Sequence, residues 1–261
     1  MFDFSKLSPA KWRRPFSKAA PVGMSGYASP SLASNAGRVA PSLKWVALAA
    51  LAAILMESVG FGMLPIKAWL TSSHELFHAM AGWLTGGVVE SIQADGEHGG
   101  VTYTRGGIYP IISCAGYLGC GGFGALCLRY SGRPAMRAAF MAFCVALPLA
   151  LLVKGRFIQG GYGVGMAEAL AVDALALWAA RSRWSQFVLA LSGCLFLSMG
   201  LDDLRVLLVY ATDQTDAGLL ARWMGLPFLA WPIALAYAGA MLAMWFWAFR
   251  GLARDMRGSP R

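Results

Sequence analysis

Two of the three histidines in the chain lie four residues apart in SSHELFHAM, residues 72–80. On a helix, His74 and His78 would project from the same face, one turn apart. This spacing allows both imidazoles to bind one zinc ion, while Glu75 lies beside the ion without needing to coordinate it. In this HExxH pattern, Glu75 would be the general base toward a water molecule that the metal activates. The segment therefore predicts a Zn²⁺ site with hydrolytic chemistry.

The sequence around this motif is strongly apolar, because 57% of the 261 residues are hydrophobic and only 13% are charged. Soluble domains carry about 25% charged residues. Apolar runs long enough to cross a bilayer as helices recur along the chain. They fall at about 43–64, 66–85, 108–130, 136–154, 157–180, 184–209 and 226–249. The sequence thus predicts an all-α polytopic membrane protein with six to seven transmembrane helices. Ionisable side chains are costly inside a membrane, so His74, Glu75 and His78 are candidates for a functional site.

The net charge of +9 is concentrated at the two ends of the chain. Basic flanks around apolar spans indicate the cytoplasmic side and attract anionic lipid, so we expect a lipid bilayer partner and no nucleic acid. Residues 1–41 are expected to be a disordered basic tail, 42–250 the transmembrane domain and 251–261 a second basic tail. Strict alternation of seven spans would place the second tail outside. One of the seven segments is therefore expected to be re-entrant or not a span.

Residues 86–107, GGVVESIQADGEHGGVTYTRGG, follow the histidine-bearing helix. Two short β-prone stretches flank the turn-rich segment ADGEHGG, a pattern typical of a β-hairpin. We therefore expect a short β-hairpin insertion within the helical domain.

Two histidines do not complete a zinc site, so a third ligand must come from elsewhere in the fold. The candidates are the acidic residues inside apolar segments, namely Glu57, Glu168, Asp173, Asp202 and Asp203. The segment SMGLDDLRVLL, residues 198–208, places two of them within a long apolar helix. Asp202 is the predicted ligand and Asp203 the alternative. Either could instead pair with Arg205 or cap a helix end.

Five segments carry a resemblance to a known family. They are HELFHAMAGWLTGG (74–87), GGVTYTRGG (99–107), SCAGYLGCGGFGA (113–125), GLDDLRVLL (200–208) and TDAGLLARWMGLP (215–227). The chain resembles the M50 family of intramembrane zinc metallopeptidases, the site-2 protease class, and most closely its compact M50B-like branch. The resemblance implies that His74 and His78 are zinc ligands, that Glu75 is the catalytic base and that Asp202 is the third ligand. The chain has LDD where better-studied members have LDG or NPDG.

The resemblance implies a zinc-dependent intramembrane endopeptidase, which hydrolyses peptide bonds in or near transmembrane segments of membrane-protein substrates. It also implies a multi-pass protein of the bacterial inner membrane, and a hairpin edge that receives the unwound substrate as an added strand. The glycines of residues 113–125 would let their helix approach another closely, with the HELFH helix as a candidate partner. A non-proteolytic scaffold or degenerate homologue that keeps a structural metal is the alternative. A transporter ranks last, because polar residues concentrate in two segments.

Overall fold

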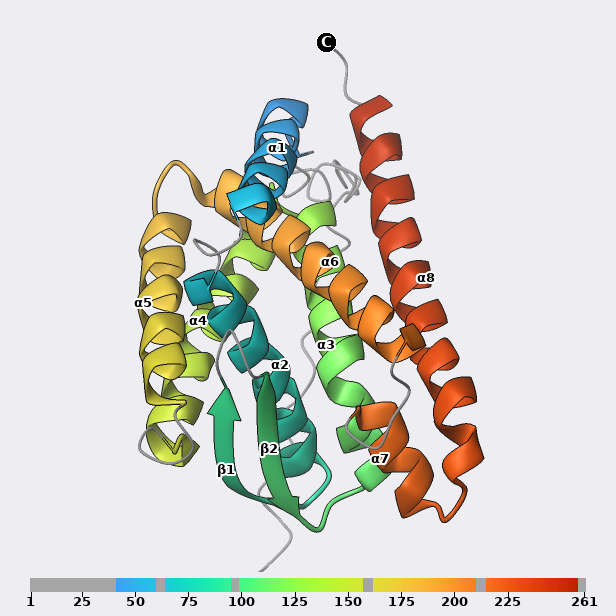
Figure 1. Cartoon of the computed structure of the whole chain (residues 1–261). Helices are drawn as coiled ribbons and strands as arrows, with labels where there is room; N and C mark the ends of the chain where they lie inside the picture. Colours follow the sequence, from blue (N-terminus) through green and yellow to red (C-terminus); the bar gives the residue numbers. More distant parts are fainter. Residues whose placement is uncertain (1–40, 60–63, 95–98, 157–161, 210–214, 258–261) are drawn as a thin grey trace, which may run out of the picture. The chain divides into compact units, whose positions relative to one another are not determined.

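The computed structural model describes residues 41–59, 64–94, 99–156, 162–209 and 215–257 (Figure 1). The predicted N-terminal tail lies outside these residues except for Pro41, as does the last part of the C-terminal tail, 258–261. The helices are α1 (Leu43–Val59), α2 (Leu64–Leu84), α3 (Tyr109–Arg129), α4 (Pro134–Lys154), α5 (Gly163–Ala180), α6 (Ser185–Val209), α7 (Asp216–Trp223) and α8 (Ala230–Arg257). Each predicted apolar segment therefore contains one long helix, and α7 lies in a region where none was predicted.

Within the described residues, five helices are long and apolar enough to cross a membrane: α3, α4, α5, the first part of α6, and a stretch that covers most of α8. Helix α1 has 17 residues, and α2 carries the polar residues of the HExxH segment. The helical, multi-span architecture with a small hairpin is confirmed. The predicted number of six to seven spans is not.

Helices α1 and α2 both run parallel to α6. At the start of α1 the ring of Trp45 lies 5.2 Å from that of Trp184, just before α6, and further along Ser198 of α6 donates a hydrogen bond to Glu57. Helix α2 follows the same direction, with Trp69 5.4 Å from Phe196 and with the HExxH turn beside the last turns of α6. Two successive helices therefore run the same way along the bundle.

This arrangement places both basic ends of the described chain together. The start of α1 and the end of α8 meet in one cluster, which includes Val46, Ala49 and Leu252, and Figure 1 shows both at the same end of the bundle. The conflict between seven alternating spans and the basic C-terminal tail disappears, because α1 and α2 do not alternate in direction. With both described ends on one side of the bundle, the arrangement is compatible with the positive-inside rule.

The segment after α2 forms the predicted hairpin, with β1 (Val88–Ala94) antiparallel to β2 (Gly100–Arg105). A bulge lies between Val89 and Ser91. The hairpin rests on the second half of α2 through Val89 and Ile92, which are fully buried. The backbone N–H of Arg156 donates to the Ile92 carbonyl at 3.1 Å. The segment after α4 therefore covers the outer edge of β1 at this residue. Within the described residues, the outer edge of β2 has no strand partner.

Helix α2 is fixed from the opposite side by a buried hydrogen bond to α5. The indole Nε1–H of Trp69 donates to Asp173 Oδ1 at 3.0 Å, and both residues are only 1% exposed. A hydrogen-bonded partner removes most of the cost of placing a carboxyl group inside an apolar bundle. Asp173 therefore anchors the helix that carries the HExxH segment and lies apart from the site described next.

Candidate metal centre and catalytic site

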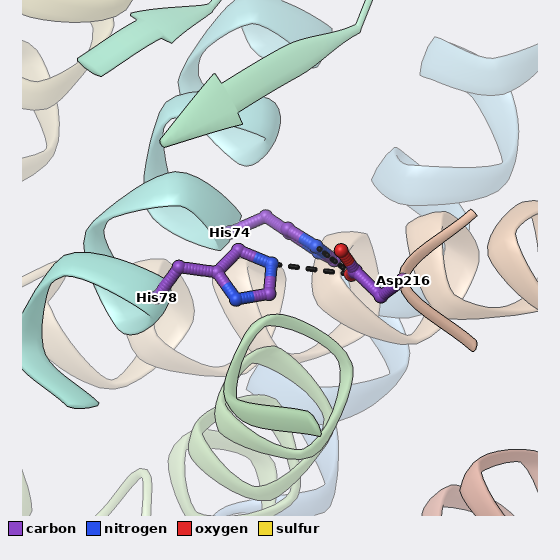
Figure 2. Close-up of side chains that lie close together, drawn as sticks. All are labelled: His74, His78 and Asp216. Carbon is purple, nitrogen blue, oxygen red and sulfur yellow. Dashed lines mark hydrogen bonds and ion pairs between the residues drawn. The ribbon is translucent and has the colours of Figure 1, made fainter. Parts of the chain in front are cut away.

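His74 and His78 of α2 converge on Asp216, the first residue of α7 (Figure 2). Asp216 Oδ2 lies 3.3 Å from His74 Nε2 and 3.2 Å from His78 Nε2. One donor atom from each side chain lies within 4.8 Å of the other two. Among the described residues, this is the group of acidic, histidine and cysteine side chains that could hold a metal ion. The two histidines of the motif therefore lie together, close enough to share one ion with Asp216.

The orientation of His78 is set by a backbone carbonyl. Its Nδ1 lies 2.6 Å from the Ile112 oxygen at the start of α3, so Nδ1–H donates there. With its proton on Nδ1, a neutral His78 can use Nε2, the nitrogen nearest Asp216, to bind a metal ion. His74 is oriented by packing instead, with its ring 4.8 Å from the Tyr117 ring in a T-shaped contact. Its buried Nδ1 has no hydrogen-bond partner among the described residues.

Asp216 is the first residue of α7, and the residue before it, Thr215, caps this helix. The side chain of Thr215 accepts a hydrogen bond from Gly218 N–H at 3.2 Å and so caps α7. Ser113 Oγ donates to the Asp216 carbonyl at 2.9 Å and ties the cap to α3. Burial alone would raise the pKa of Asp216, but in this metal-free arrangement the two histidines, when protonated, outweigh burial and hold that pKa below its ordinary value. The carboxyl group is therefore ionised, the form in which it binds metals.

Glu75 is buried beside this group, and the hairpin positions it. Thr102 Oγ1, on β2, donates to Glu75 Oε2 at 2.6 Å and lies 3.0 Å from the Glu75 carbonyl oxygen. Gly100, also on β2, leaves room for the carboxylate, because a Cβ there would lie 2.7 Å from Oε1. Glu75, His74 and Asp216 line one cavity of about 210 Å³. Glu75 thus lies next to the cluster without joining it, as a general base requires.

Gly116 lets α3 approach both imidazoles closely, because it has no side chain. A Cβ built on Gly116 would overlap Nε2 of both His74 and His78, so no larger residue fits at this position. The prediction that the glycine-rich segment packs on the HELFH helix is confirmed. Two imidazole nitrogens and one carboxylate oxygen are a donor set typical of catalytic zinc, with further positions left for water or substrate. The residues present therefore fit the metal that the motif predicts.

The structure does not bring the predicted third ligand, Asp202, into this group. Asp202 is exposed on α6. Asp203, the alternative, lines the cavity but does not belong to the candidate metal group. Asp216 takes the place predicted for them. Asp216 lies in a short connecting helix, outside the apolar segments that contain the predicted candidates. The pair Thr215–Asp216 before AGLLARW is a helix-start signal that could have drawn attention to it.

Thr102 is a further residue of the site that sequence reasoning missed. Only the packing of β2 against α2 brings it to Glu75. Its segment, GGVTYTRGG, nevertheless belonged to the resemblance that the sequence showed.

Comparison with protein-family models matches residues 45–248 to the family described as Peptidase M50B-like. The chain belongs to the M50B-like peptidase family. The match extends from α1 to α8 and so includes the HExxH helix, the hairpin and Asp216. Searches of curated proteins and of solved structures gave no significant match. Family membership and the five apolar helices together make this M50B-like protein a multi-pass membrane protein of a metallopeptidase family.

Proposed function

We propose that this M50B-like protein is a zinc-dependent intramembrane endopeptidase, which hydrolyses peptide bonds in or near transmembrane segments of other membrane proteins. The observation that carries the proposal is the convergence of His74 Nε2, His78 Nε2 and Asp216 Oδ2 beside the buried Glu75. We further propose that both basic ends face the cytoplasm of a bacterial inner membrane.

His74, His78 and Asp216 would hold the zinc ion. When bound, zinc would polarise the scissile carbonyl and make a water molecule easier to deprotonate. Glu75 would accept the proton of the attacking water and pass it to the leaving amide nitrogen. Thr102 would hold the Glu75 carboxylate in position through its hydrogen bond to Oε2. The Ile112 carbonyl would keep the proton of His78 on Nδ1 throughout.

The hairpin supports a peptide substrate. A helical peptide directs its carbonyls into its own hydrogen bonds, so a transmembrane helix must be extended before its backbone can be attacked. The outer edge of β2 could receive such an extended segment by strand addition. Gly100, the first residue of β2, lines the same cavity as Glu75. A substrate strand on this edge would therefore lie close to the base.

Replacing Glu75 by Gln tests the proposed mechanism. We expect cleavage of reconstituted single-span substrates to fall by about 10²- to 10⁴-fold, the usual contribution of a general base. Zinc content should stay stoichiometric, because Glu75 is not a ligand. Metal analysis and gel-based cleavage on the same preparation measure both quantities.

Glu90→Gln is the matched control, because Glu90 lies on β1 and pairs with Arg105 at 3.3 Å, away from the cavity. Full activity of the Glu75→Gln variant would refute the assigned base. A wild-type protein that holds zinc but cleaves none of the substrates would instead favour a degenerate homologue with a structural metal.

Replacing Thr102 by Val tests whether the hairpin positions the base. A hydrogen bond to a charged group contributes about 1.5–3 kcal/mol, so we expect kcat to fall roughly 10- to 100-fold while KM and zinc content change little. Thr102→Ser should restore most of the activity, because it keeps the hydroxyl group. Steady-state kinetics of the two variants separate the hydrogen bond from the methyl group.

Thr104→Val is the control on the same strand, where the Thr104 methyl group approaches Gly82. An equal loss in the Thr104→Val variant, or no loss in Thr102→Val, would contradict a positioning role for the Thr102 hydroxyl.

A further inference from the structure

A second and larger cavity lies apart from the candidate metal centre. It is an apolar groove of about 610 Å³ between α1, α2, α5 and α6. Its walls include Met56 of α1, Ile66 and Trp69 of α2, Leu175 of α5 and Leu195 of α6. No described helix fills this groove, and the helices that form it belong to the membrane domain. An apolar ligand from the bilayer is therefore the kind of molecule that it suits.

One end of the groove carries exposed tryptophans and basic side chains. Trp178 and Trp184 both line the groove, and they are 68% and 42% exposed. The guanidinium group of Arg183 lies 5.5 Å from the centre of the Trp184 ring. Trp184 in turn contacts Trp45, and Lys44 Nζ lies 5.4 Å from the centre of the Trp45 ring. Tryptophan beside Lys and Arg is typical of the level of the lipid headgroups.

Arg181 completes this basic rim. It caps the end of α5, where its backbone N–H donates to the Trp178 carbonyl at 3.2 Å. Lys44, Arg181 and Arg183 are all exposed, and the ion pairs found in the described part of the chain do not include them. Lys44 and Arg183 therefore lie against tryptophans at this end of the groove, and Arg181 lies three residues after Trp178.

We propose that this groove binds one anionic phospholipid, with an acyl chain between α1, α2, α5 and α6 and the phosphate at Lys44, Arg181 and Arg183. Basic pockets between transmembrane helices are suited to anionic headgroups. The lysine and the arginine beside the tryptophans at one end of the groove favour an anionic lipid over an uncharged apolar ligand.

The bound lipid would stabilise the helix that carries the HExxH segment. Trp69 forms part of the groove wall and donates its hydrogen bond to Asp173. The Trp69 carbonyl accepts a hydrogen bond from Ser73 at 2.7 Å, one residue before His74. A chain packed on Trp69 would therefore support α2 just before the metal ligands. This effect on stability does not depend on the proposed peptidase activity.

Native mass spectrometry of the full-length protein in detergent, with added phosphatidylglycerol or phosphatidylcholine, tests the proposal. We expect one phosphatidylglycerol to stay bound and to raise the thermal unfolding temperature, and phosphatidylcholine to do neither. Each Lys or Arg near an anionic lipid contributes about 1 kcal/mol. The double variant Arg181→Gln/Arg183→Gln should therefore bind phosphatidylglycerol roughly thirtyfold more weakly. Arg250→Gln/Arg254→Gln, which removes two exposed charges from α8, should bind it like the wild type.

A second pair of variants tests the apolar part of the groove. Ala176 lines the groove, whereas Ala174 is an exposed residue of the same helix that does not. Ala176→Phe should exclude the lipid, and Ala174→Phe should leave binding unchanged. Glycerol phosphate, which has the headgroup charge without acyl chains, should not stabilise the protein.

Several results would overturn the proposal. Equal binding of the two lipids would show that the headgroup charge is not recognised. An equal loss of phosphatidylglycerol binding in the α8 variant would show that only the general surface charge matters. Lipid retained by Ala176→Phe would place the lipid elsewhere. Stabilisation by glycerol phosphate alone would indicate a phosphate site, and a bound mass equal to a peptide or a second copy of the chain would identify a protein occupant.

Discussion

Asp216→Asn is expected to lose zinc, whereas Asp202→Asn is expected to retain it. Asp216 supplies the carboxylate oxygen 3.2–3.3 Å from both Nε2 atoms. An amide in its place carries no charge to attract the ion. The loss in zinc affinity should exceed the roughly 10- to 100-fold cost of removing an outer-shell partner, because a direct ligand is removed. Cleavage should fall with it to the level of the metal-free protein.

The measurement is zinc content and competition against a chelator of known affinity, followed by cleavage at saturating zinc. Asp203→Asn is the most informative control, because Asp203 lines the same cavity without belonging to the candidate metal group. It should keep stoichiometric zinc. If Asp202→Asn or Asp203→Asn released zinc and Asp216→Asn retained it, the ligand set proposed from the structure would be wrong.

Gly116→Ala is expected to abolish zinc binding although it adds a single methyl group. The new Cβ would overlap both ligating nitrogens, so the imidazoles would have to turn away or α3 would have to move from α2. His78 has little freedom to turn, because its Nδ1–H is bound to Ile112, one turn before Gly116 on α3. We expect zinc affinity to fall by about 100-fold or more, and cleavage to be lost with it.

Gly122→Ala is the matched control on the same helix. Its Cβ would meet only the flexible Met244 side chain, with Sδ at 3.3 Å. Both variants carry the same change in helix propensity, so a comparison of zinc titration, cleavage and thermal unfolding isolates the steric effect at the metal centre. Normal zinc binding by Gly116→Ala would show that α3 does not approach the imidazoles as closely as the structure indicates.

The HExxH half of the site was predictable from local sequence. His74, Glu75 and His78 belong to one helix, where a spacing of four residues fixes which side chains share a face. The hairpin was predictable for a similar reason, because alternating apolar residues around a turn-rich segment define two strands by themselves. The apolar runs likewise located the long helices, since segments surrounded by lipid must satisfy their backbone groups internally.

The remaining parts of the site depend on contacts between residues that are distant in the chain. Asp216 lies 142 positions after His74, and no local pattern distinguishes it from Asp202 as a partner of the two imidazoles. Thr102 reaches Glu75 only because β2 packs on α2, and Gly116 meets the imidazoles only because α3 crosses them. The sequence by itself determined the helices, the hairpin and the placing of His74, Glu75 and His78 on one helix, all set by periodicity. Only the tertiary structure decided which acid is the candidate third ligand, because helix packing determines which distant carboxylate meets the histidines.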